Sequence, residues 1–390
     1  MKSKFFYVFI ASFIIIFISC SKSFDDIPVF DLSSDPGIET IYLSEICESI
    51  EYMPINSSGS LIGRAFAYRI KDGILVIGTP DELFLVETST GAIKSHLDKR
   101  GKGPGQYQSI SSFDISQNGD RIYILDRFRQ FIHIYDNNCS EINRIKLSSF
   151  SSRLFLWNDS TILLYTEPMR GNEELSFVLL AMKGDTLDSV KNKFIYSAPQ
   201  FVVYQGLMPS FRIGPDFYYK EQMDDTLFCF DYEMLPEPVA VFNTGDYLLT
   251  REKRESLNEA TAIDPGVEAL RIHSVFSIHG YYLFSYDYSY RPRHEEGLKY
   301  GIGNKKTQEA KLLREEGFVN DLDGGLPFFP HIQIDQDYLI QIVDPYKLIL
   351  HKSQPESDIP PSGSFKDVSN VIDEGDNPVI VSCKLKNPSR

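Results

Sequence analysis

The sequence is short of positive charge for its size. Its 390 residues hold 39 Lys and Arg against 54 Asp and Glu, which gives a formal net charge of −15. A protein that binds nucleic acid needs a clustered basic surface to neutralise phosphates, so this composition argues against nucleic acid as a partner. Hydrophobic residues make up 42% of the chain and charged residues 24%, which argues against an intrinsically disordered chain.

The short motifs of common catalytic and metal sites are also missing. The chain contains neither GxSxG nor HExxH,. The cysteines Cys47, Cys139, Cys229 and Cys383 are far apart and form no CxxC pair, so the spacing of a cysteine metal site is absent. We therefore expect no catalytic residue and no resident cofactor. The sequence leaves open which of these cysteines pair in disulfides and which are free thiols.

The N-terminal hydrophobic run is too short to span a membrane. Residues 5–19 carry no charge and follow Lys2 and Lys4, whereas a membrane span needs about 20 apolar residues. A basic start followed by such a run is typical of a secretory signal peptide. The run ends in Phe-Ile-Ser-Cys at residues 17–20, which resembles the lipobox of bacterial lipoproteins. This resemblance implies cleavage before Cys20 and its acylation, with palmitate-type chains that anchor the protein in the outer membrane, facing the periplasm or the cell surface.

Tryptophan is nearly absent, but other aromatic residues are abundant. There is one Trp beside 28 Phe and 22 Tyr, and Phe and Tyr favour strands. From about residue 39 onward, short apolar-alternating runs such as residues 74–77 and 122–125 are separated by Gly, Asp, Asn and Pro. This pattern of strands and turns predicts an all-β fold. Residues 251–262 are the clearest helical candidate.

The strands recur in a repeat. Placing Asp72 over Asp120, an offset of 48 residues, aligns Ile74 with Ile122 and Val76 with Ile124. Fainter copies begin at Asp159, Asp216, Gly280 and Asp337. Six such units predict a six-bladed β-propeller of four-stranded blades, because a single blade cannot bury both of its faces. A pair of β-sandwiches and a seven- or eight-bladed ring are the alternatives.

These patterns give boundaries for the chain. We expect a signal peptide at residues 1–19, a lipid-anchored tether at 20–38, the propeller at 39–386 and a tail at 387–390. Short helical insertions are expected near residue 251 and within residues 353–377. The protein is expected to be a monomer.

Four stretches together resemble a known group of proteins. They are GKGPGQY at residues 101–107, NDLDGG at 320–325, DNPVIV at 376–381 with the following Leu385-Lys386, and IYLSEICESIEYMP at 41–54. In this order they resemble the six-bladed β-propeller lipoproteins of Bacteroidetes, which are related to NHL and TolB-like propellers. The resemblance implies the propeller fold over nearly the whole mature chain. It implies no catalytic residue, because the function of that group is largely unassigned.

Two of these stretches suggest ligand sites. Asn320, Asp321 and Asp323 offer oxygen atoms of the kind that Ca²⁺ prefers, although a tight turn stabilised by the Asn and Asp side chains explains the same residues. The glycines at residues 101–105 suggest a phosphate cradle. Because the P-loop spacing and a following helix are absent, a turn between blades is the preferred interpretation.

A run of tyrosines is the third candidate site. In residues 281–290, alternation places Tyr282, Phe284, Tyr286, Tyr288 and Tyr290 on one face of a strand,. Such a wall usually packs between blades. If its end opens at the pore, Tyr288, Tyr290, Arg291 and Arg293 could bind a sugar or an anionic group.

The predicted function follows from the fold and the absence of catalytic motifs. We expect a lipoprotein of the cell envelope that binds a glycan, a peptide or a protein partner, or acts as a scaffold, without enzymatic activity. The alternative is a propeller-type lyase or hydrolase with a metal or a histidine at the central pore. Acidic, Asn and His side chains from different blades that converge on the axis would favour the enzyme.

Overall fold

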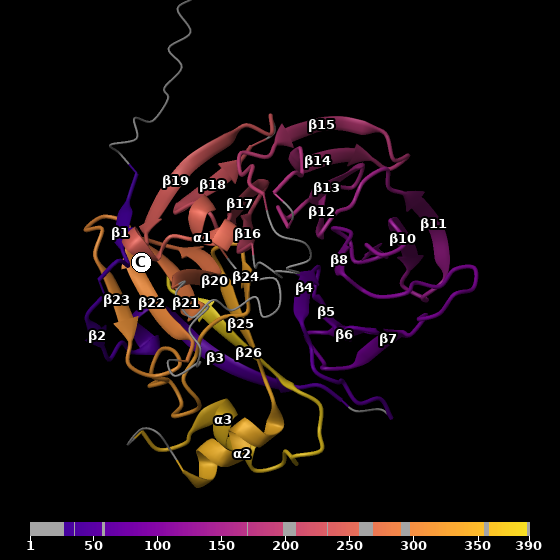
Figure 1. Cartoon of the computed structure of the whole chain (residues 1–390). Helices are drawn as coiled ribbons and strands as arrows, with labels where there is room; N and C mark the ends of the chain where they lie inside the picture. Colours follow the sequence, from indigo (N-terminus) through magenta and orange to yellow (C-terminus); the bar gives the residue numbers. More distant parts are fainter. Residues whose placement is uncertain are drawn as a thin grey trace, which may run out of the picture.

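The alternating apolar runs fold into six sheets that surround a central axis, as Figure 1 shows. This computed structural model describes residues 27–34, 36–56, 59–169, 171–197, 208–231, 233–256, 268–289, 297–354 and 359–387. Each sheet is one blade of four antiparallel strands, and two of the sheets add a parallel fifth strand at the outer edge. The prediction of a six-bladed β-propeller with four-stranded blades is therefore confirmed.

Blades 1 to 3 are each built from four consecutive strands. Blade 1 comprises β4 (Ala67–Lys71), β5 (Ile74–Gly78), β6 (Leu83–Glu87) and β7 (Ile93–Leu97). Blade 2 comprises β8 (Ser112–Ile115), β9 (Arg121–Asp126), β10 (Phe131–Asp136) and β11 (Glu141–Lys146). Blade 3 comprises β12 (Arg153–Asn158), β13 (Thr161–Tyr165), β14 (Leu175–Ala181) and β15 (Thr186–Lys191).

Blades 4 and 5 gain a fifth strand from the N-terminal region. Blade 4 comprises β16 (Ser210–Ile213), β17 (Asp216–Lys220), β18 (Thr226–Phe230) and β19 (Pro236–Asn243), with β1 (Val29–Asp31) added in parallel to β19. Blade 5 comprises β20 (Ala269–Ile278), β21 (Tyr281–Ser289), β22 (Lys299–Asn304) and β23 (Ala310–Leu313), with β2 (Ile38–Glu39) added in parallel to β23.

The N-terminal stretch therefore contributes to the ring before residue 39. Residues 29–31 lie in the region expected to be a tether, yet Phe30 and Leu32 are fully buried against blades 4 and 5. Burial of these two side chains holds β1 in place, because each contributes about 2 kcal/mol when it leaves water.

The ring closes by joining the two ends of the chain. Blade 6 comprises β24 (Ile332–Ile334), β25 (Tyr338–Val343), β26 (Val379–Leu385) and, at its outer edge, β3 (Cys47–Pro54). The N-terminal β3 pairs antiparallel with the C-terminal β26, with Tyr52 opposite Val381. The thiols of Cys47 and Cys383 face each other at this seam; both are fully buried, and the four described cysteines are free thiols.

The hydrophobic core is divided among the six interfaces between neighbouring blades. One buried cluster lies in each interface, and the blades of the repeat contribute alternate residues of each strand to the clusters on either side. Phe177 of blade 3, for example, meets Tyr219 and Phe230 of blade 4 edge to face, at centroid distances of 4.7 and 5.0 Å. Such contacts add to the apolar area that each blade buries.

Three α-helices interrupt the strands in the described residues. The helix α1 (Arg251–Ser256) covers the first half of the helical candidate, whose remainder lies outside the described residues. The helices α2 (Pro345–Ser353) and α3 (Gly363–Ser369) lie side by side next to blade 6 (Figure 1). This insertion begins earlier than residue 353, because Pro345 starts a helix directly after β25,. In the described part of the chain, no helix is long and apolar enough to cross a membrane.

Candidate functional site

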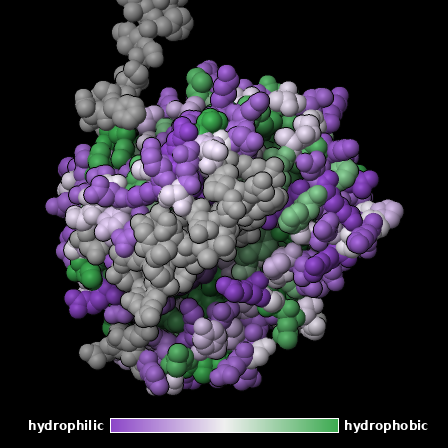
Figure 2. All heavy atoms as spheres, viewed as in Figure 1, coloured by the Kyte–Doolittle hydropathy of each residue, from purple (hydrophilic) through white to green (hydrophobic). Residues whose placement is uncertain are grey.

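The innermost strands enclose a cavity of about 1480 Å³. Every blade contributes to its wall, as Tyr68, Ser112, Arg153, Ser210, His273 and His331 illustrate. Where Figure 2 shows the described residues, hydrophobic ones lie in a hollow near the middle of this face, and the rim is largely hydrophilic. The cavity is therefore a mixed apolar and polar site on the axis of the ring.

Apolar side chains in the cavity are unusually open to solvent. Phe66 is 45% exposed, Phe128 63%, Tyr346 50% and Leu350 52%, and all four line the cavity. Large apolar groups in a concave site, beside a few polar groups, are typical of ligand pockets.

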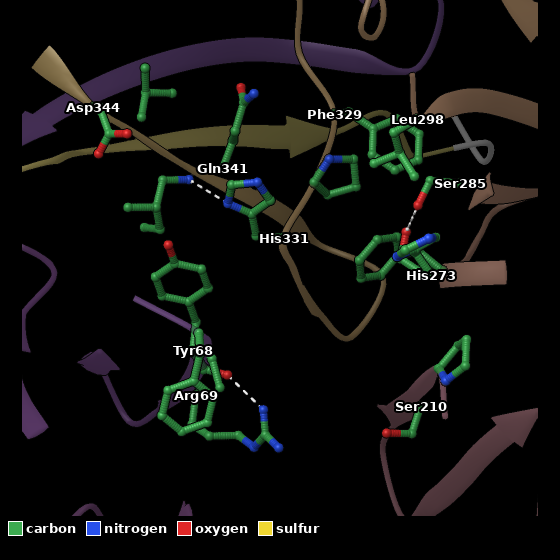
Figure 3. A pocket seen from close by; sticks show the side chains of 18 of the residues that line it. Tyr68, Arg69, Ser210, His273, Ser285, Leu298, Phe329, His331, Gln341 and Asp344 are labelled. Carbon is green, nitrogen blue, oxygen red and sulfur yellow. Dashed lines mark hydrogen bonds between the residues drawn. The ribbon is translucent and has the colours of Figure 1, made fainter. Parts of the chain in front are cut away.

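The imidazole of His331 lies on one wall, where its ring stacks on Tyr68 with planes 3° apart (Figure 3). Its Nδ1 accepts the main-chain N–H of Ile342 at 3.1 Å, so the neutral ring carries its proton on Nε2. The blades around the cavity partly desolvate the ring of His331, although it stays open to the cavity, and this lowers its pKa to about 4; the charge of Lys347 adds to this effect. His331 is therefore a neutral hydrogen-bonding group at pH 7.

His273 lies on the wall that blade 5 contributes. It is the extra residue of a β-bulge, because Ile272 pairs with Tyr286 and Ser274 pairs with Ser285. Bulges re-aim side chains in this way. Its Nε2 lies 2.9 Å from the carboxylate of Asp287. Burial raises the pKa of Asp287, but hydrogen bonds from His273 and Arg271 outweigh burial and hold that pKa well below its usual range.

Arg69 and Arg153 enter the cavity from blades 1 and 3. The guanidinium of Arg69 lies over the rings of Phe113 and Phe155, at 5.7 and 5.9 Å. Arg153 donates one hydrogen bond to the main-chain oxygen of Met208 at 3.2 Å. Burial lowers the pKa of Arg153, the carboxylate of Glu167 opposes this, and the neighbouring charge of Arg69 lowers the pKa further.

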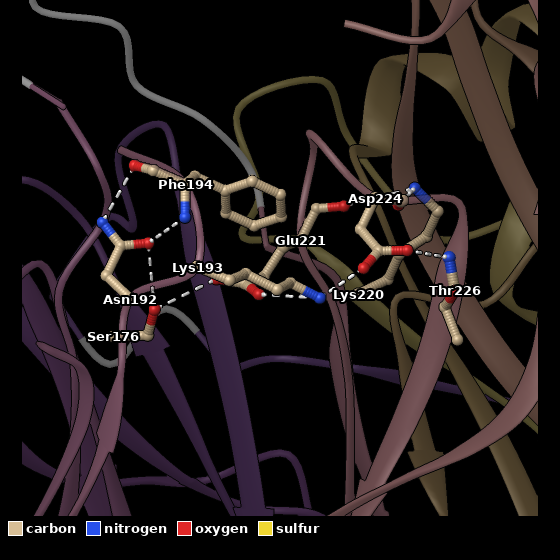
Figure 4. A network of polar contacts seen from close by, with 8 residues as sticks. All are labelled: Ser176, Asn192, Lys193, Phe194, Lys220, Glu221, Asp224 and Thr226. Atoms are coloured by element: carbon tan, nitrogen blue, oxygen red, sulfur yellow. Dashed lines mark hydrogen bonds and ion pairs between the residues drawn. The ribbon is translucent and has the colours of Figure 1, made fainter. Parts of the chain in front are cut away.

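A second group of polar side chains lies between blades 3 and 4 (Figure 4). We refer to it as the Glu221 cluster, and it consists of Ser176, Asn192, Lys193, Lys220, Glu221 and Asp224. Lys220 donates to the main-chain oxygens of Glu221 at 3.3 Å and Asp224 at 2.8 Å. Lys193 forms an ion pair with Asp224, and its Nζ lies 3.8 Å from the carboxylate of Glu221. Burial raises the pKa of Glu221 to about 7.

The structure places the predicted calcium residues in a tight turn after blade 5. Asn320 donates to Asp323 at 2.8 Å and to the hydroxyl of Tyr52 at 3.1 Å. Asp323 accepts the main-chain N–H groups of Gly325 and Phe365, and Asp321 accepts the N–H of Ser44. These contacts join the turn to β3 and α3, as the turn interpretation expects. No group of three or more His, Cys, Asp or Glu suited to a metal ion occurs among the described residues, and calcium binding here stays a prediction.

The tyrosine wall packs between blades 4 and 5. Tyr282, Phe284, Tyr286 and Tyr288 all belong to the buried cluster of that interface. Tyr288 is 8% exposed and meets Tyr247 edge to face at 5.0 Å, and it is not part of the cavity wall. Tyr290, Arg291 and Arg293 lie outside the described residues, as does Cys20. A role of these residues in binding therefore stays a prediction.

The glycine-rich turn at residues 101–107 joins blades 1 and 2. The side chain of Gln106 accepts the N–H of Gly103 at 2.7 Å, and Arg129 donates to the main-chain oxygens of Gly101 and Gln106. Gly105 has φ = 67°, a conformation that favours glycine. A hydrogen bond within the turn and two from Arg129 of blade 2 satisfy these polar groups, in line with the structural interpretation of the motif.

Comparisons with known proteins agree with the fold and assign no activity. A family model described as "Domain of unknown function (DUF4934)" matches residues 27–384. A candidate exported protein of Bacteroides fragilis is similar in structure, with a TM-score of 0.68 and 15% identity over 92% of this chain and 99% of that chain. A member of the DUF4221 family from Bacteroides vulgatus has a TM-score of 0.51 and 11% identity, over 87% of this chain and 97% of that chain. No protein of curated function matches the sequence.

Proposed function

The chain belongs to the DUF4934 family of domains of unknown function, and we propose that it is a binding module of the cell envelope, without enzymatic activity, whose ligand lies in the central cavity. The observation that carries this proposal is the cavity itself. Its volume of about 1480 Å³ is larger than the roughly 300–1,000 Å³ of common small-molecule pockets,. A ligand of several linked units, such as an oligosaccharide or a peptide, fits a cavity of this size.

The rigidity of the ring supports a binding role. Each blade is fixed by a hydrophobic cluster on both sides, and β3 closes the ring. Side chains of the six inner strands are therefore held in place before a ligand arrives, which lowers the entropy cost of binding.

A blocked cavity tests the proposal. Ser210 lines the cavity on β16, and Ser210→Trp would fill part of it. Ser189 lies exposed on the outer strand β15, so Ser189→Trp is the matched control. Thermal unfolding of the wild type and both variants would be followed with glycans, peptides, Ca²⁺, Zn²⁺ and EDTA. A ligand at one hundred times its Kd adds about 2.7 kcal/mol of stability.

We expect a glycan or peptide that stabilises the wild type and Ser189→Trp but not Ser210→Trp. Equal stabilisation of all three proteins would place the ligand elsewhere and contradict the proposal. If no compound stabilises the wild type, a protein partner or a scaffold role gains support, and crosslinking in the native envelope would identify that partner.

Lipid anchoring is a separate part of the proposal. The sequence at residues 17–20 and the likeness to a candidate exported protein of Bacteroides support an envelope location. Cys20 would carry the acyl chains that attach the protein to the outer membrane, and each buried CH₂ contributes about 0.8 kcal/mol. Cys20→Ala should abolish labelling with a palmitate analogue, and labelling that persists would contradict this assignment.

One observation favours the alternative of a propeller lyase or hydrolase. His273 from blade 5 and His331 from blade 6 line the same cavity as Tyr68 from blade 1, so histidines of different blades do converge there. Incubation of acidic and neutral oligosaccharides with the protein, followed by mass spectrometry, tests the alternative. Shortened products that disappear in His273→Ala or His331→Ala would establish the enzyme.

A further inference from the structure

Two arginines, Arg69 and Arg153, lie near each other in the wall of the cavity, in a region that we call the floor. Arg153 and Phe155 lie two residues apart on β12, and therefore on the same face of the strand,. The guanidinium of Arg69 lies 5.9 Å from the centre of the Phe155 ring. Arg69 from blade 1 thus reaches past blade 2 toward blade 3, where its charge acts on Arg153, and both side chains line the cavity.

Most donors of these two guanidinium groups have no protein acceptor among the described residues. A guanidinium carries five N–H donors. Arg69 donates to the main-chain oxygen of Tyr68 at 2.8 Å, and Arg153 donates to that of Met208. Neither side chain appears among the groups that are shut off from solvent without a partner. The remaining donors therefore face the open volume of the cavity.

The nearby carboxylates do not fully neutralise the positive charge of the arginines at the cavity floor. Asp114 lies 3.9 Å from Arg69, and its charge also acts on the buried Arg212. The carboxylate of Asp114 accepts the N–H groups of Ile115 and Leu156, at 2.9 and 2.8 Å. Glu167 is the remaining acidic group that acts on Arg153. The guanidiniums of Arg69, Arg153 and Arg212 thus share the carboxylates of Asp114 and Glu167.

The rest of the wall favours a sugar over a peptide. Seven serines line the cavity: Ser109, Ser111, Ser112, Ser152, Ser210, Ser274 and Ser285. Phe66, Tyr68 and Phe128 offer aromatic surface beside them. Hydroxyl donors and acceptors next to flat apolar rings match the two kinds of surface that a sugar presents, its hydroxyl groups and its C–H face.

A peptide that adds a strand to the wall would need open main-chain groups on the inner strands. Side chains of neighbouring blades already occupy several of them. Ser112 accepts the N–H of Leu154 at 3.1 Å, and Asp114 accepts that of Leu156. Gln333 accepts the N–H of Ser277 at 3.0 Å and donates to its oxygen. Strand addition, the common mode of peptide capture, is therefore blocked at β12 and β20.

We propose that Arg69 and Arg153 bind the carboxylate of an acidic sugar, so that the ligand of the cavity is a uronate-containing oligosaccharide. This inference rests on the proposed function, because it names the class of ligand for the same cavity. A guanidinium binds a carboxylate with two parallel hydrogen bonds, and two guanidiniums fix both its position and its plane. Binding a single carboxylate also relieves the repulsion between the two arginines.

The test compares each acid with its own ester. Isothermal titration of the full mature chain would use trisaccharides of galacturonate, glucuronate and mannuronate, and the same trisaccharides with methyl-esterified carboxyl groups. Esterification removes the charge and keeps the rings and hydroxyls. We expect at least one acid to bind about tenfold or more tightly than its ester, since hydrogen bonds to charged groups contribute about 1.5–3 kcal/mol. Higher salt should weaken the binding of the acid and leave the binding of the ester unchanged.

Matched variants assign the effect to the two arginines. Arg153→Gln and Arg69→Gln should each reduce affinity for the acid about tenfold and leave affinity for the ester unchanged. Arg144→Gln, on the exposed outer strand β11, is the control and should bind as the wild type does. Either cavity variant suffices if the other fails to fold.

Three outcomes would overturn the inference. Equal binding of acids and esters that Ser210→Trp abolishes would leave the cavity as the site but remove the carboxylate from recognition. Tighter binding of a tripeptide rich in Asp and Glu than of any trisaccharide would replace the sugar with a peptide. No binding of any uronate trisaccharide at millimolar concentration would exclude this ligand class, while the proposed function would stand or fall on its own screen.

Discussion

The central cavity and the Glu221 cluster contain similar residues, but the polar groups of these residues have different hydrogen-bond partners in the two regions. Both combine cationic and acidic side chains with serines inside the ring of blades. In the Glu221 cluster, Lys220 makes two hydrogen bonds to main-chain oxygens, and Lys193 pairs with Asp224. In the cavity, Arg69 and Arg153 each make one hydrogen bond, and their other donors face open volume.

This difference separates a structural network from a binding site. Polar groups that satisfy one another hold two blades together, and removing one partner leaves a buried group unsatisfied. Polar groups that face a cavity contribute little to folding and stay available to a ligand. The two regions should therefore respond in opposite ways to substitution: the cluster in stability, and the cavity in binding.

The largest effect is expected for Lys220→Ala. Lys220 is 4% exposed. Its loss leaves the two main-chain oxygens that it contacts without a donor. It also removes the positive charge that faces the carboxylates of Asp224 and Asp225. We expect the free energy of unfolding to fall by about 3 kcal/mol. Urea denaturation measures this change, with Lys146→Ala on the exposed end of β11 as the control. A loss below about 1 kcal/mol would mean that these bonds, which lie within blade 4, contribute little to stability,.

The next effect is a pH dependence that Glu221 imposes. Its pKa is about 7 in the folded protein against 4.5 as the ordinary value. Between these pH values the unfolded chain releases the proton while the folded chain keeps it, so stability falls as pH rises through this window. The fall amounts to at most about 3 kcal/mol. Glu221→Gln should remove it, and melting curves from pH 4 to 8 measure the difference. An unchanged slope in the variant would contradict the assignment.

Arg153→Gln should have a smaller effect on stability. The substitution removes one hydrogen bond to Met208 and also the repulsion between Arg153 and Arg69. Because these two effects oppose each other, we expect the free energy of unfolding to change by less than about 1 kcal/mol. Binding of an acidic trisaccharide should nevertheless fall about tenfold. Urea denaturation and titration on the same preparation give both values. A loss of stability as large as that of Lys220→Ala would make the cavity floor part of the structural framework.

The smallest effect is expected for His331, and its sign is opposite to that of Glu221. Its pKa is lowered from 6.5 to about 4. As pH falls through this window, the unfolded chain takes up a proton and the folded chain does not, so stability decreases toward acid pH. Because the ring is open to the cavity, the decrease should be smaller than the effect of Glu221. The double variant His331→Gln/Glu221→Gln, compared with Glu221→Gln alone, isolates the contribution of His331. The two proteins should lose stability at different rates as pH falls from 6.5 to 4, and an identical loss in both would refute the assignment.

The repeat in the sequence predicted the fold because the same strand of each blade carries it. The copies at Asp72, Asp120, Asp159, Asp216, Gly280 and Asp337 all start the second strand of a blade or the turn before it. That strand is covered on both faces by neighbouring blades and has a strand on each side, so it is apolar in every copy. The short β1 carries no such signal, because its three residues depend on pairing with β19, more than 200 positions away.

The cavity could not be predicted in the same way. Arg69, Arg153 and His331 belong to different blades, and each stands alone in a stretch without a motif. They come together only because the ring closes. The glycine-rich turn and the NDLDGG turn were visible in the sequence, since their residues bond within a few positions of one another. Local spacing therefore identified turns, and the distribution of the site over six blades concealed it.

The most direct test of this account measures the affinity for a uronate trisaccharide in Arg153→Gln and Glu221→Gln at pH 7. The account predicts that Arg153→Gln loses about tenfold in affinity and keeps its melting temperature. Glu221→Gln should bind as the wild type does, although its stability changes with pH in a different way. Loss of binding in Glu221→Gln, with wild-type affinity in Arg153→Gln, would contradict the assignment of the cavity as the binding site.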